Sequence, residues 1–261
     1  MSDSVLRDQA GAVATITINR PAARNALTNE TKVALLNALR DCSSDPGTRA
    51  VILTGAGGAF CAGQDLREHA ESLAAGASLT DTVRDYYNPM IMTIASMAKP
   101  VIAALPGVAA GAGAGLAFAC DFRIAARRAS FLMAFARIGL TADSGASWTL
   151  QRLAGSARAA ELLMLAEPVD SARALELGLL TSVVDDEELP GAAAEFAARL
   201  AAGPTLAYAA IKESLLYAAG HGLHEALGQE ADLQGKLGQT QDHQAAVQAF
   251  LRKEQVAFEG R

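Results

Sequence analysis

Asp143 lies where a carboxylate could do acid–base chemistry, in the stretch FARIGLTADSGASW. Apolar side chains precede and follow it, and a carboxylate held among them would lose solvation, which raises its pKa and makes it a usable general base. These apolar neighbours are Phe135, Ile138, Leu140 and Trp148. Asp143 also stands just before a predicted helix, SGASWTLQRL, and aspartate is a preferred N-cap residue. One side chain cannot fill both roles completely, and position alone favours the cap.

Two glycine-containing loops could bind an anionic oxygen. In FCAGQDL (60–66), Gly63 allows a tight turn that leaves peptide N–H groups free to point at a ligand. In GVAAGAGAGLAFAC (107–120), the loop runs into a helix whose first N–H groups lack intrahelical partners. Two such N–H groups directed at one point would form an oxyanion hole. The glycines could equally serve only to let segments pack closely.

Other motifs are weaker. GAGGAF (55–60) follows a strand pattern, but Phe60 stands where the third glycine of a dinucleotide-binding loop belongs. His221 and His224 lie near Glu225, in a segment typical of an exposed turn and helix start, so we expect no metal site. Ser144 lacks the G-x-S-x-G context of a hydrolase nucleophile.

Composition narrows the class of protein. The chain has 261 residues, 51% of them hydrophobic, and a formal net charge of −6, which argues against disorder and against nucleic acid as a partner. Its three cysteines (Cys42, Cys61 and Cys120) lack CxxC spacing, which argues against a disulfide framework or a cysteine zinc site. The first residues, MSDSVLRDQAG, contain no apolar core of signal-peptide length, so we expect a cytoplasmic protein.

The uncharged segment from Pro100 to Cys120 is long enough to span a bilayer. However, Pro106 and Gly107 interrupt it after only VIAAL, and alanine and glycine supply most of the rest. A buried strand, a tight loop and a close-packed helix explain it better, and we expect no membrane association.

The first two thirds of the chain alternate strand and helix patterns. Strands are predicted at 13–20, 49–55, 101–105, 121–126 and 130–135. Thr28 can cap a helix carrying Val33, Leu36 and Leu39, and a further helix at 80–98 contains Pro89, which predicts a kink or two shorter pieces. After Asp143 come helices beginning at Ser156 and Ser171, a short strand at 179–186, and three or four helices from about residue 187.

The chain resembles the enoyl-CoA hydratase/isomerase (crotonase) family. The matching segments, in order, are ITINRPAARNAL, VILTGAGGAFCAGQDL, KPVIAALPGVAAGAGAGLAFACD, ARIGLTADSGASW and AFLRKEQVAF. The resemblance implies an α/β fold, a spiral of ββα units at 1–195 with a helical C-terminal trimerisation region at 196–261. It also implies an acyl-CoA substrate, no permanently bound cofactor, and a homotrimer or a dimer of trimers.

The same resemblance implies roles for individual residues. The N–H groups of Gln64 and Ala112 would form the oxyanion hole for a thioester carbonyl, beside Gly63 and Gly111. Phe250 and Lys253 would approach a neighbouring subunit's coenzyme A site. The coenzyme A site itself would be lined by Arg24, Ala26, Ala62, Gln64, Asp65 and Leu66.

One departure from the family pattern bears on the reaction. Hydratases of the family carry two glutamates that activate water, and Gly115 and Phe135 stand in their places. The chain is more similar to the branch of ring-1,2-epoxyphenylacetyl-CoA isomerases, with one aspartate in a PDSGG-like motif; Ala142 and Ala146 replace its common proline and glycine. We therefore expect an acyl-CoA isomerase with Asp143 as its base. The alternatives are an enoyl-CoA hydratase and a non-catalytic thioester-binding scaffold.

Overall fold

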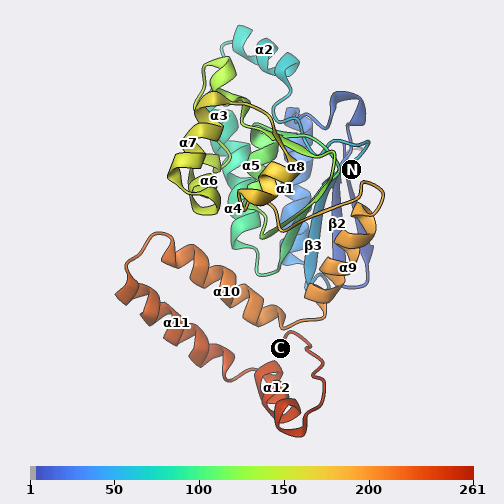
Figure 1. Cartoon of the computed structure of the whole chain (residues 1–261), viewed down its shortest axis with the longest axis vertical. Coiled ribbons are helices and arrows are strands. Elements are labelled where there is room, and N and C mark those ends of the chain that lie inside the picture. Colours follow the sequence, from blue (N-terminus) through green and yellow to red (C-terminus); the bar gives the residue numbers. More distant parts are fainter. Residues whose placement is uncertain (1–3) are drawn as a thin grey trace.

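A computed structural model describes residues 4–261 (Figure 1). Its main element is a six-stranded sheet with the order β1-β2-β3-β4-β6-β9. The strands β2 to β9 of this sheet run parallel to their neighbours, and β1 pairs antiparallel with β2 through a tight hairpin at Gly11. The bounds are β1 Val5–Ala10, β2 Val13–Ile18, β3 Ala50–Gly55, β4 Val101–Leu105, β6 Phe122–Ala126 and β9 Ser182–Val184. The sequence patterns did not predict β1.

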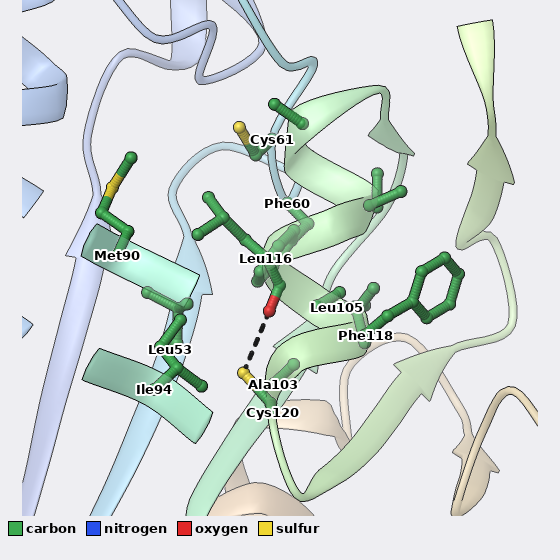
Figure 2. Packing of buried hydrophobic residues seen from close by; sticks show 14 of the residues in the cluster. Leu53, Phe60, Cys61, Met90, Ile94, Ala103, Leu105, Leu116, Phe118 and Cys120 are labelled. Atoms are coloured by element: carbon green, nitrogen blue, oxygen red, sulfur yellow. Dashed lines mark hydrogen bonds between the residues drawn. The ribbon is translucent and has the colours of Figure 1, made fainter. Parts of the chain in front are cut away.

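Successive side chains of these strands enter two different cores, because a strand points alternate residues to opposite faces. On β3, Val51 and Leu53 face one core, while Ala50 and Ile52 face the other. Figure 2 shows the first core, where Leu53 packs near Met90 and Leu116, from two helices that cover this face. Both faces of the sheet are buried, which explains why the sequences of these strands consist of consecutive apolar residues.

The helices follow the strands along the chain. One covering layer includes α1, α4 and α5, and α9 covers the opposite face through Leu189, Ala193 and Ala197. The helix bounds in this part are α1 Asn29–Ser44, α2 Leu66–Ala74, α3 Leu79–Thr82, α4 Asn88–Ser96, α5 Ala112–Ala119, α6 Ala146–Ala154, α7 Ser156–Leu165, α8 Ser171–Glu176 and α9 Leu189–Ala201; short 3₁₀ turns lie at η1 Pro21–Ala23 and η3 Ala134–Ile138, and a π-helical turn at η2 Val83–Tyr87.

A smaller sheet lies beside the first. In it β5 (Ala109–Ala110) pairs parallel with β7 (Ser130–Leu132), and β7 pairs antiparallel with β8 (Val169–Asp170). A single bridge joins Cys61 to Ala109, so the two glycine-containing loops run side by side. This pairing brings segments about fifty residues apart in sequence to one place.

The last three helices extend away from the sheet (Figure 1). They are α10 Thr205–Ala218, α11 Leu223–Leu237 and α12 Gln241–Arg252. Lys212 on α10 ties this region to the core by an ion pair of 2.7 Å with Asp121. The predicted division between residues 195 and 196 falls inside α9, which packs on the main sheet. In the structure, the chain leaves the sheet at the turn between α9 and α10.

The segments with unusual sequence patterns adopt the expected structures. The uncharged stretch contains β4, a tight loop and α5, and no helix within residues 4–261 is long and apolar enough to cross a membrane. The predicted helix at 80–98 is divided into α3, η2 and α4, with Pro89 in the first turn of α4. Thr28 caps α1 by accepting the N–H of Thr31, but Val33 is exposed rather than buried.

Candidate active site

A largely apolar cavity of about 320 Å³ lies where the two glycine-containing loops meet. Side chains from α2, α3, η2 and η3 form its walls. Eight of the residues predicted for the site line it: Ala26, Ala62, Gly63, Gln64, Leu66, Gly111, Ala112 and Asp143. The structure therefore brings together the two residues predicted for an oxyanion hole, the carboxylate, and four of the six residues predicted to line the coenzyme A site.

Gly63 is required by the approach of the two loops. Its φ is +84°, and a Cβ atom at this position would lie 2.7 Å from the carbonyl oxygen of Ala110 and 3.3 Å from the nitrogen of Ala112. The loops are joined by a hydrogen bond of 2.9 Å from the Ala110 N–H to the Cys61 carbonyl. The close-packing interpretation of this glycine is thus confirmed.

The same packing leaves two N–H groups available at the cavity. The Gly63 carbonyl accepts the Leu27 N–H, and the Asp65 N–H donates to the Leu27 carbonyl, so Leu27 pairs with the residues on either side of Gln64. Ala112 is the first residue of α5, where an N–H has no intrahelical acceptor. Within residues 4–261, neither the Gln64 N–H nor the Ala112 N–H is engaged in a backbone hydrogen bond. Close packing and an oxyanion hole are therefore compatible.

Asp143 does not cap a helix. The helix α6 begins at Ala146, and its N-cap is Gly145, with no side-chain hydrogen bond. The Asp143 main-chain carbonyl, not its carboxylate, accepts the Ala146 N–H. The cap prediction is wrong, because the positive φ of Ser144 and Gly145 turns the chain before the helix starts. The carboxylate borders the cavity instead and accepts a 2.8 Å hydrogen bond from Ser144 Oγ.

The surroundings of Asp143 perturb its ionisation. Burial raises the pKa of the carboxyl, while the Ser144 hydroxyl and the positive charge of Lys32 act in the opposite direction. Three of the four apolar neighbours predicted from the sequence line the same cavity: Phe135, Ile138 and Leu140. Trp148 does not line the cavity; its side chain is exposed, and the Arg152 guanidinium lies over its ring at 3.9 Å. A carboxylate with a raised pKa in an apolar cavity is suited to proton transfer.

Neither position of the two family glutamates offers a carboxylate. A Cβ atom at Gly115 would lie 2.5 Å from the Cβ of Ser144 and 2.7 Å from its carbonyl oxygen. The backbone of the Asp143 loop therefore occupies the space that a side chain at position 115 would need. Phe135 forms an apolar wall of the cavity.

Four predicted coenzyme A residues do not line the cavity. Arg24 lies beside it and accepts the Ala62 N–H through its carbonyl, at 3.0 Å. The Asp65 carboxylate caps α2 and pairs with Arg20 at 3.0 Å; although burial opposes ionisation, these partners lower its pKa. Phe250 and Lys253 lie in and at the end of α12, at the opposite end of the molecule from α2 (Figure 1).

Sequence reasoning missed two residues next to the site. Lys32 is completely buried on α1, and Tyr87 lines the cavity from η2. Lys32 lies three and four positions before Leu35 and Leu36, so helical spacing places it on the buried face. Within residues 4–261, no group of three or more His, Cys, Asp or Glu side chains is arranged to hold a metal ion.

Comparisons with known proteins agree with this geometry. Residues 8–261 match the family described as enoyl-CoA hydratase/isomerase. The chain is 39% identical over 262 residues to the 1,2-epoxyphenylacetyl-CoA isomerase of Escherichia coli (strain K12), covering 100% of both chains. It is 42% identical over 249 residues to a Rhodobacter capsulatus protein named "Probable enoyl-CoA hydratase", covering 95% of each.

Solved structures extend the likeness to three dimensions. An enoyl-CoA hydratase from Polaromonas sp. JS666 superposes with a TM-score of 0.90 at 33% identity, covering 98% of this chain and 99% of that one. The fold is thus the α/β crotonase fold expected from the sequence motifs. The chain belongs to the enoyl-CoA hydratase/isomerase family, whose members act on coenzyme A thioesters.

Proposed function

We propose that this protein is an acyl-CoA isomerase in which Asp143 moves the proton. One observation carries the proposal. Among the residues within 4–261 that line the cavity, Asp143 is the one with a carboxylate, and Gly115 and Phe135 stand where hydratases of the family have their two glutamates. One base that takes up a proton and returns it elsewhere is sufficient for isomerisation. The identity of 39% over the full chain to a relative named 1,2-epoxyphenylacetyl-CoA isomerase also supports an isomerase.

The proposed mechanism uses the two loops and the carboxylate together. The thioester carbonyl oxygen accepts the N–H groups of Gln64 and Ala112, which stabilise the negative charge of an enolate. The Asp143 carboxylate removes a proton from the carbon next to the carbonyl or from one further along the acyl chain. The resulting carboxylic acid, whose proton exchanges with solvent, then delivers a proton to another carbon, so the double bond moves and the number of protons on the substrate is unchanged.

A linear enoyl-CoA fits this chemistry directly. With the ring epoxide of an aromatic acyl-CoA, the bond between the two epoxide carbons would also break as the double bonds shift, so the ring expands and every atom is retained. The cavity walls are mainly apolar, with Leu79, Val83 and Ile138 among them, which suits either acyl group. The coenzyme A part is proposed to lie along Arg24, Ala26, Ala62, Asp65 and Leu66. Since the net charge of −6 provides no long-range attraction for an anionic ligand, local cations must contribute.

We also propose that the protein self-associates, as a trimer or a dimer of trimers. The helices α10 to α12 expose large apolar side chains, which usually marks an interface. The most exposed are Leu215, Leu223, Phe250 and Leu251, and Phe250 is 83% exposed. In such an assembly Phe250 and Lys253 would reach a neighbour's coenzyme A site. Sedimentation at micromolar concentration tests this, and a monomer would contradict it.

Substrate turnover by wild type and by Asp143→Asn tests the proposed reaction. Asparagine keeps the size of the side chain and can still accept the Ser144 hydroxyl, so thioester binding and folding should persist. Isomerisation of a 3-enoyl-CoA or of an epoxide substrate should fall by about 10²–10⁴-fold. Robust hydration of crotonyl-CoA by wild type would favour a hydratase instead. Thioester binding without turnover by either form would favour the scaffold.

A further inference from the structure

Lys32 is a buried cation directly behind the wall of the cavity. Its side chain has an exposed fraction of 0%, although lysine is almost never fully buried without a partner. It lies in the second turn of α1, a helix otherwise buried through leucines such as Leu35 and Leu39. A methionine or leucine would fill this place without the cost of burying a charge. The lysine therefore needs an explanation other than packing.

The contacts of Lys32 converge on Gln64. The Lys32 ammonium donates to Gln64 Oε1 at 3.1 Å, and the Tyr87 hydroxyl donates to the same oxygen at 2.5 Å. The ammonium also lies 5.2 Å and 5.5 Å from the ring centroids of Tyr86 and Tyr87, within the range of cation–π attraction. The side chain of Gln64 is thus held from two elements, α1 and η2. Its backbone N–H is one of the two donors at the cavity.

Lys32 lies close enough to Asp143 to act on it electrostatically, because the two side chains that its ammonium contacts, Gln64 and Tyr87, line the same cavity as the Asp143 carboxylate. Burial lowers the pKa of the Lys32 ammonium, but the negative charges of Glu68 and Asp143 raise it. In the reverse direction, Lys32 favours the ionised form of Asp143 against the effect of burial. Two further groups near this pair are His69 on α2, which lines the cavity with Asp143, and Tyr86, whose ring faces the Lys32 ammonium. The Tyr87 hydroxyl, whose own pKa burial and Asp143 raise, and the Ser144 hydroxyl, which donates to Asp143, also face it.

We propose that Lys32 is a positioning residue of this active site, which holds the oxyanion-hole loop through the Gln64 side chain and acts as the counter-charge of the Asp143 carboxylate. The catalytic part of this inference rests on the proposed isomerase function. The electrostatic part concerns the ionisation of Asp143 in the free protein and can be measured without turnover.

Lys32→Met is the variant that tests the inference, because methionine keeps the length of the side chain and removes the charge. Lys99→Met is the matched control: Lys99 is also buried, but its ammonium donates to the carbonyls of Cys42 and Asp45. In protein carrying ¹³C-labelled aspartate carboxyls, Asp143 is assigned by the loss of its signal in Asp143→Asn. Its titration midpoint and the acid limb of kcat/KM are then measured for both lysine variants.

We expect Lys32→Met to move both the Asp143 midpoint and the acid limb to higher pH, on the order of one pH unit. Lys99→Met should leave both in place, and Lys32→Arg should retain the wild-type midpoint. Equal midpoints in Lys32→Met and wild type would overturn the inference. If the midpoint moves but wild type isomerises no thioester, the counter-charge role stands and the isomerase proposal fails.

Tyr87→Phe provides a second test that does not depend on the folding of Lys32→Met. It removes one of the two donors to Gln64 Oε1 but leaves the Lys32 charge. We expect Tyr87→Phe to lower kcat and to leave the acid limb of kcat/KM at the wild-type pH. A wild-type kcat in this variant would overturn the proposal that these contacts position Gln64.

Discussion

Gly63→Ala is the perturbation whose effect the structure defines most closely. The residue has a φ of +84°, where an alanine costs roughly 1–2 kcal/mol. The new methyl group would also lie 2.7 Å from the Ala110 carbonyl oxygen and 3.3 Å from the Ala112 nitrogen. Such overpacking costs about 1–3 kcal/mol more. Because the methyl group presses on Ala112, which we propose provides one oxyanion-hole N–H, the loops must separate.

The separation of the two loops should affect turnover as well as stability. Loss of one oxyanion-hole donor typically lowers the rate by about 10²–10³-fold, and we expect this loss in kcat for Gly63→Ala. Gly11→Ala is the control, since Gly11 also has a positive φ, +57°, with nothing within 4 Å of the new Cβ atom. It should lose only the backbone contribution to the free energy of unfolding, measured in urea, and keep full turnover. Wild-type kcat in folded Gly63→Ala would refute the assignment of these loops as an oxyanion hole.

Three further results are expected. Gly115→Ala should lower the free energy of unfolding by about 1–3 kcal/mol, because its methyl group meets Ser144. Gly228→Ala in α11, with open space around the new methyl group, should instead raise the free energy of unfolding by up to about 1 kcal/mol. Urea denaturation compares the two variants, and wild-type stability of Gly115→Ala would contradict the described packing. Burial raises the pKa of Asp143, so the ionised base is lost as the pH falls through that raised pKa. We therefore expect kcat/KM to decline on the acid side at a higher pH than an exposed aspartate would give. A pH profile limited only by an ordinary carboxyl pKa would contradict this. Thr28→Ala removes the cap of α1 and should cost about 0.5–2 kcal/mol of unfolding free energy by thermal or urea denaturation, with no change in the acid limb.

Local patterns predicted most elements, because their signals lie within short segments. The alternation of VATITI and the apolar run AVILTG identify β2 and β3, and Thr28 identifies the start of α1. The strand β1 was missed, because VLRDQA has exposed side chains along almost its whole length and so carries little apolar signal. The existence of an edge strand depends on its partner rather than on its own composition.

The candidate site shows the same division between local and long-range information. The motifs identified Gly63, Ala112 and Asp143, whereas excluding Asp143 as a helix cap required knowing that α6 begins at Ala146 with Gly145 as its N-cap. Asp65 was predicted for coenzyme A, but Arg20 and the first turn of α2 already engage its carboxylate. Lys32 and Gln64 are 32 residues apart, and only the packing of α1 on the loop brings them into contact. No local pattern encodes such a contact.

Proton exchange at the substrate tests the role of Asp143 most directly. A 3-enoyl-CoA is incubated with the enzyme in D₂O, and deuterium entering the acyl carbons is followed by NMR. The account predicts deuterium incorporation by wild type, and a loss of about 10²–10⁴-fold in Asp143→Asn with thioester binding retained. Exchange at the wild-type rate in Asp143→Asn would contradict it, because some other group would then be moving the proton.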